Sequence, residues 1–143
     1  MNSDRRKAVD MLIEEFWKKG YLTLFRKFGT YLPEPTTIGG FEVDAIAKYK
    51  NTFAIGITLC DQDFNDPVMV KNKLTYLANR HSKGSNKKVQ LFVGVSLLNL
   101  KNAKALLEEL DVDIKKNIRL FQISYRDNIS TYKDKKSEKV LFS

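Results

Sequence analysis

Residues 38–59 constrain the fold more than any other part of the chain, because they hold two apolar runs joined by a short polar turn. Phe41 to Lys48 is predicted to form one strand, and Phe53 to Cys60 a second. The second run is almost entirely apolar, which is typical of a central strand buried on both faces. The first run carries Glu42 and Asp44, and a buried acid costs free energy unless something, such as a divalent metal, compensates it. The two strands are therefore predicted to form the centre of a sheet, and the two acids are predicted to mark a candidate site beside it.

Length and composition bound the kind of protein. A chain of 143 residues with 43% hydrophobic and 29% charged residues fits one globular domain of a soluble protein. No apolar run approaches the roughly 20 residues that a membrane span needs, so no membrane partner is expected. Cys60 is the single cysteine and His81 the single histidine, which excludes an internal disulfide and a Cys/His zinc site within one chain. These features favour a cytoplasmic setting.

The charge of the chain favours a polyanionic partner. The formal net charge is +8, and the pI is near 9.5. An excess of this size suits nucleic acid, because neutralised phosphates release counterions and the binding then depends on salt. The alternative is a basic surface without a partner.

Helix and strand patterns alternate along the chain, which is typical of a layered α/β domain. Ser3 is the predicted N-cap of a first helix that ends at Gly20, and Asp66 with Pro67 starts a later one. The remaining predicted elements are a strand over Tyr21 to Phe28, the end of the second helix near Arg80, a strand over Val89 to Val95, a helix from Asn99 or Asn102 to Leu110, a strand over Ile118 to Ser124, and a charged tail from Asp127.

The hairpin around Asp44 resembles the core of the PD-(D/E)XK nuclease superfamily, which includes restriction-endonuclease-like and Holliday-junction-resolvase-like proteins. The family order of helix, three-strand meander, helix and strand can be laid on residues 4–96. The resemblance implies that residues 1–143 form a single restriction-endonuclease-like domain with three layers, a central mixed sheet flanked by helices. Residues 97–143 would then add a helix, a strand and the charged tail.

The resemblance also implies a catalytic site, which this chain retains only in part. Asp44 is similar to the family's metal-binding Asp, which holds Mg²⁺ or Mn²⁺; its alternative is an acid paired with a neighbouring lysine. Gly56 and Thr58 stand where the family has Glu-x-Lys, so ordinary metal-dependent cleavage is expected to be lost or impaired. Glu42 and Asp61 are the other candidate metal ligands, and Lys73 is the candidate for a relocated catalytic lysine.

A second set of residues is predicted to contact nucleic acid, DNA rather than RNA. Asn72 and Tyr76 are similar to a Gln-x-x-x-Tyr element of some nuclease-family members. Lys133 to Lys139 alternates with acids and fits a solvated tail. The predicted contact residues lie on or after the second main helix: Lys71, Lys73, Tyr76, Arg80, Lys83, Lys87 and Lys88.

Three functions therefore stay open from the sequence. The first is a nucleic-acid-binding protein of nuclease fold without effective cleavage. The second is an active Mg²⁺- or Mn²⁺-dependent endonuclease with relocated residues. The third is a structural subunit that assembles as a homodimer or with another protein.

Overall fold

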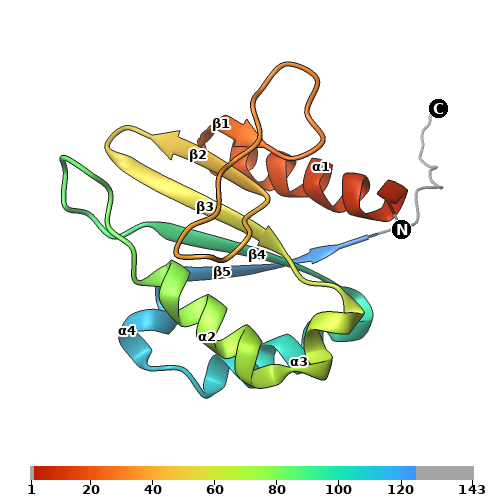
Figure 1. Ribbon diagram of the computed structural model, residues 1–143. Coiled ribbons are helices and arrows are strands. Elements are labelled where there is room, and N and C mark those ends of the chain that lie inside the picture. The colour runs from red at the N-terminus through yellow and green to blue at the C-terminus, as the bar shows by residue number, and fades with distance from the viewer. Residues whose placement is uncertain (1, 125–143) are drawn as a thin grey trace, which may run out of the picture.

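A five-stranded mixed sheet forms the centre of the computed structural model, which describes residues 2–124 (Figure 1). The helices and strands run in the order α1 (Asn2–Lys18), β1 (Leu22–Arg26), β2 (Ala45–Tyr49), β3 (Thr52–Thr58), the 3₁₀ helix η1 (Asp61–Asn65), α2 (Pro67–Ala78), β4 (Gln90–Ser96), α3 (Leu97–Glu108), α4 (Val112–Lys115) and β5 (Ile118–Ile123).

The sheet has the strand order β1-β2-β3-β4-β5. The first three strands form an antiparallel meander, and β3, β4 and β5 run parallel to one another. Helix α1 covers one face of the sheet, while α2, α3 and α4 lie on the other (Figure 1). The predicted α/β class and the central mixed sheet flanked by helices are confirmed.

Strand β3 is buried on both faces, as its apolar run predicts. Ala54 packs in the cluster beneath α1, and Ile55 and Ile57 pack in the larger cluster beneath α2 and α3. The alternation follows from the two-residue period of a strand, which sends successive side chains to opposite faces. Strand β3 therefore contributes side chains to both clusters of the core, one on each face of the sheet.

Capping residues in the sequence predict the start of α2 correctly but the starts of α1 and α3 wrongly. Asp66 caps α2 by accepting a hydrogen bond from the backbone N–H of Met69 at 3.2 Å, as predicted. Helix α3 begins directly after Ser96, so the predicted start at Asn99 or Asn102 is wrong. Asn99 instead lies buried inside the first turns, where its amide donates to Ser96 and to Asp61. Helix α1 already includes Ser3, so its predicted role as N-cap is wrong too.

The C-terminal additions are present as far as the chain is described. Helix α3 packs on β4 and β5, and β5 adds a parallel edge strand. The predicted tail from Asp127, with its Lys133 to Lys139 cluster, lies outside the described residues. Among residues 2–124, no helix combines the length and the apolar character needed to cross a membrane.

Candidate functional site

Asp44 lies immediately before β2 and is buried, with 4% of its surface exposed. Its Oδ2 atom accepts hydrogen bonds from the backbone N–H of Thr58 at 2.7 Å and from the Thr58 hydroxyl at 2.9 Å. Its Oδ1 atom accepts a hydrogen bond from Nη2 of Arg5 at 3.0 Å, and Nζ of Lys27 lies 3.9 Å away. Protein donors and two cations therefore compensate this buried carboxylate, as the alternative of a paired acid requires.

The neighbouring acids do not complete a metal site with Asp44. Glu42 is exposed and accepts a 2.7 Å hydrogen bond from Lys27, which lowers the pKa of Glu42 both by that bond and by its charge. Asp61 accepts from the amide of Asn99, and Asp63 accepts from the backbone N–H of Cys60 at 2.7 Å. Within residues 2–124, no three acidic, histidine or cysteine side chains are grouped to hold an ion. With Arg5 and Lys27 already on Asp44, these residues do not fit Mg²⁺ or Mn²⁺.

A pocket of about 280 Å³ opens beside Asp44 at the carboxyl end of β3. In open α/β sheets, ligands bind outside the carboxyl ends of the strands. Most of the lining is polar or charged, so the pocket suits a polar group rather than an apolar ligand. Its charged and hydroxyl residues come from α1, from the segment before β2, from β3, from η1 and from α2: Arg5, Glu42, Asp44, Thr58, Asp63 and Lys73.

Lys73 lies in this pocket, where the hypothesis of a relocated lysine requires it. Burial lowers the pKa of Lys73, and the charges of Asp44, Asp63 and Glu42 oppose that shift. Its amine forms no hydrogen bond and no ion pair with any residue of the described part of the chain. The pocket thus contains one partly buried amine that the surrounding carboxylates influence without contacting it.

We expect Lys73→Met to raise the free energy of unfolding at neutral pH, because a charged amine with a lowered folded-state pKa destabilises the fold. Between that lowered pKa and the ordinary value of 10.5, the unfolded chain binds more protons, so wild-type stability rises with pH. The advantage of the variant should therefore shrink toward pH 10.5. Urea unfolding of both proteins across this range measures it, and a difference that does not change with pH contradicts the shift.

The packing leaves no room at Gly56 for the acid that the resemblance implies. Position 56 faces α1, and a Cβ atom there would lie 2.6 Å from Cδ2 of Leu12 and 2.8 Å from Cζ of Phe16. Both neighbours are fully buried core residues, so they have no free space to move into. Thr58, two residues on, faces the same side and gives its hydroxyl to Asp44. Helix α1 therefore occupies the space that a glutamate would need.

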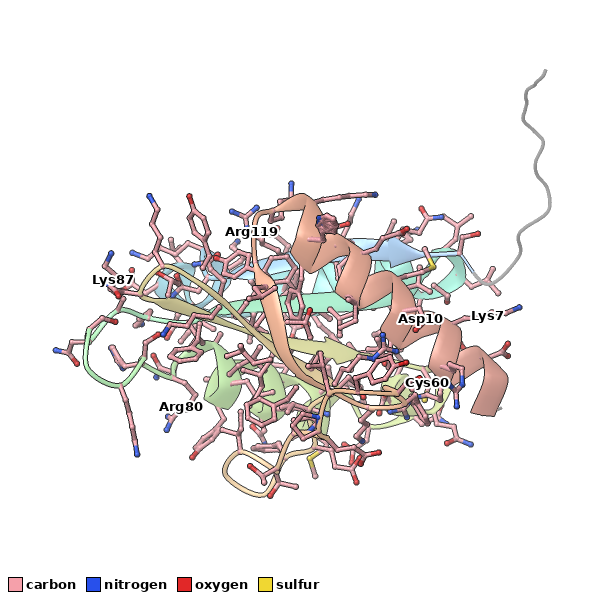
Figure 2. The ribbon with its side chains drawn as sticks, turned by 90° about the horizontal axis from the view of Figure 1, so that it is seen from above. Lys7, Asp10, Cys60, Arg80, Lys87 and Arg119 are labelled. Atoms are coloured by element: carbon pink, nitrogen blue, oxygen red, sulfur yellow. The ribbon has the colours of Figure 1, made fainter. Side chains whose placement is uncertain are left out.

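The structure separates the residues predicted to contact nucleic acid. Lys71 forms a 2.8 Å ion pair with Glu109, which directly follows α3, and Lys73 lines the pocket. Tyr76 packs on Phe41 and lies beneath the guanidinium of Arg80, which is 3.9 Å from the ring centroid. Arg80 and the loop that carries Lys83, Lys87 and Lys88 follow the other end of α2. Figure 2 shows Arg80 and Lys87 far from Cys60, which follows the carboxyl end of β3.

This other end of the molecule joins Arg80 and the lysines of that loop to further lysines from the end of α1 and from the β2–β3 hairpin, which the sequence did not combine with them. The loop before β4 contacts the β2–β3 turn, because Ser85 Oγ donates to the carbonyl of Asn51 at 2.8 Å. Gly20, after α1, lies against the ring of Tyr49 at the end of β2. We call the set that these contacts bring together the basic end: Lys18, Lys19, Lys48, Lys50, Arg80, Lys83, Lys87 and Lys88.

None of the segments that form the basic end contains an acid, and residues 45–60 and 67–107 have none at all. No member forms an ion pair with another residue in the described range. These acid-free stretches were the signal in the sequence that could have found the surface. Arg5, the main partner of Asp44, gave no such signal.

Comparison of the chain with protein-family models, curated proteins and solved structures finds no match.

Proposed function

We propose that this domain binds nucleic acid, with DNA as the expected polymer, through phosphate contacts at the basic end. The observation that carries the proposal is the basic end itself, eight lysines and arginines from three acid-free segments, none in an ion pair with another described residue. Flexible basic side chains contact phosphates without reading bases, and their number sets the salt dependence of binding. Segments without acids also add no repulsion of their own toward the phosphate backbone.

We further propose that the scaffold is a restriction-endonuclease-like domain whose metal-dependent cleavage has been lost or impaired. The order of α1, the antiparallel meander β1-β2-β3, α2 and the parallel strand β4 agrees with the family core. The contacts of Asp44 with Arg5 and Thr58 support the loss of cleavage, because they engage both carboxylate oxygens. The space taken by α1 at Gly56 supports it as well.

The test compares two pairs of exposed lysines. Lys83→Gln/Lys87→Gln removes two charges from the basic end, and Lys101→Gln/Lys104→Gln removes two from the exposed face of α3. We expect the first variant to bind DNA more weakly and to lower the salt slope of log K by about 2, since each lost phosphate contact accounts for about 0.9. The second variant should behave as the wild type. Fluorescence anisotropy titrations over a range of salt concentrations give both quantities.

Two results would contradict the proposal. One is wild-type protein that shows no nucleic-acid binding even at low salt. The other is an equal loss in the two variants, which would mean that only net charge matters.

One observation favours the alternative of an active endonuclease. Lys73 and Asp44 line the same pocket, and the alternative needs a lysine amine there. An active enzyme would cleave DNA or RNA with Mg²⁺ or Mn²⁺, and would lose this activity in EDTA and in Asp44→Ala.

Assembly with a second copy or another protein is favoured by the exposed Leu22 on the edge strand β1 and by the exposed Trp17 near the end of α1. A stable oligomer without nucleic-acid affinity would support that function.

A further inference from the structure

A column of four aromatic rings runs from the core of the domain to the basic end. Phe16 and Phe92, both fully buried, pack with ring centroids 4.9 Å apart. Tyr21 continues the column at 5.6 Å from Phe92, and Tyr49 ends it at 5.8 Å from Tyr21. Tyr49 is 44% exposed, so its ring is supported by Tyr21 and remains accessible in part from solvent.

Basic residues lie along this column. The amine of Lys50 lies 5.3 Å from the centroid of the Tyr49 ring, and Lys19 precedes the Gly20 that touches the same ring. The guanidinium of Arg119 lies 5.9 Å from the centroid of Phe92. Burial raises the pKa of the Tyr21 hydroxyl, and the nearby charge of Arg119 opposes that shift. A partly exposed, supported ring beside basic residues that form no ion pair with another described residue has the two parts of a site that binds bases and phosphates together.

We infer that the basic end binds single-stranded nucleic acid, with an unpaired base stacked on Tyr49 and the adjoining phosphates held by Lys50 and Lys19. This inference rests on the proposed function and names its substrate class. A duplex hides its base faces inside its own stack, whereas an unpaired base offers a face to an aromatic side chain. A base that stacks on Tyr49 takes the place of the Lys50 amine over the ring and brings its own phosphate close to that amine.

The arrangement of Tyr49 favours stacking over a merely structural role. Tyr49 lies at the end of β2, next to the turn, with 44% of its surface free to meet a base. Its support by Tyr21 and the buried rings fixes its orientation before binding, which reduces the entropy lost on association. Stacking does not depend on sequence, because every base has an aromatic face.

The experiment measures the affinities of Tyr49→Ala and Tyr49→Phe for a labelled single strand of about 12 nucleotides and for the matching duplex. Tyr31→Ala is the control, because Tyr31 is a 94% exposed tyrosine in the loop before β2, outside the basic end. We expect Tyr49→Ala to weaken single-strand binding by about 5-fold to 150-fold and duplex binding by less than about twofold. Tyr49→Phe and Tyr31→Ala should retain wild-type affinity for both.

The outcomes separate this inference from the proposed function. If wild-type protein binds single strands and Tyr49→Ala binds them equally well, the inference is wrong while nucleic-acid binding at the basic end stands. If the wild type binds neither form, both are wrong. Lys50→Gln provides a second variant in case Tyr49→Ala unfolds, since it leaves the aromatic column intact. It should weaken single-strand binding, and an unchanged affinity there contradicts the inference.

Discussion

Replacing Asp44 with alanine is expected to lower the free energy of unfolding by about 2–4 kcal/mol. The change leaves the guanidinium of Arg5 without its partner, together with the backbone N–H and hydroxyl of buried Thr58. Unpaired buried donors lose their hydrogen bonds with water and receive nothing in return. The figure stays below the value for a fully buried ion pair because the side chain of Arg5 is 41% exposed.

The sign of this effect distinguishes a structural acid from a metal ligand. A ligand group without its ion is usually destabilising through repulsion, so its removal would leave stability unchanged or raise it. Urea unfolding without metal measures the difference, with Glu42→Ala as the control. Glu42 lines the same pocket but is exposed, and its pair with Lys27 should be worth at most about 1 kcal/mol. A neutral or stabilising Asp44→Ala, or a wild-type melting temperature that rises with Mg²⁺ or Mn²⁺, would refute the structural role.

Restoring the glutamate that the family resemblance implies, by Gly56→Glu, is expected to prevent the domain from folding. The side chain would have to displace Leu12 and Phe16 from their contact with β3, and its carboxylate would enter an apolar part of the core. Overpacking typically costs about 1–3 kcal/mol, and an unpaired buried charge adds several more. The sum is comparable to the entire stability of a domain of this size.

Circular dichroism and thermal unfolding of three variants would test this expectation. Gly56→Ala adds a single carbon and should be destabilised by about 1–3 kcal/mol while remaining folded. Ala105→Glu introduces the same glutamate at an exposed position of α3 and should change stability by less than about 0.5 kcal/mol. A folded Gly56→Glu protein would show that α1 can move away from the sheet. If Gly56→Glu/Thr58→Lys then cleaved DNA with Mg²⁺, the proposed loss of activity would be explained by these two positions alone.

The elements of the fold could be predicted where the signal is local. Asp66 and Pro67 specify the start of α2, because the Asp66 side chain caps the first turn and Pro67 occupies its first position. The apolar run from Phe53 specifies a strand buried on both faces. The start of α3 was mispredicted because Asn99 resembles a cap, whereas its amide is buried with two partners, nearby Ser96 and distant Asp61. The hydrogen bond to Asp61 joins residues 38 positions apart, so it gives no local signal.

The candidate site divides in the same way. The sequence singled out Asp44 as an acid that needs compensation, and Lys73 as an amine that could lie near it. It could not identify Arg5 as the compensating group, because that contact joins residues 39 positions apart. Nor could it assign the predicted phosphate contacts to one surface, since α2 leads from the pocket to the opposite end of the sheet.

By itself, the sequence determined the α/β class, the central strand β3 and the excess of positive charge, because these depend on periodicity and composition. Only the tertiary structure decided what the hairpin around Asp44 means. Helix α1 brings Arg5 to the carboxylate and fills the space above Gly56, so groups of the protein itself compensate the buried acid. The same packing sets Lys18 and Lys19 beside the β2–β3 turn and thereby assembles the basic end. Which charges compensate an acid, and which side chains fill the space beside a glycine, depend on residues that are close only in the folded chain. The local sequence around each residue does not identify them.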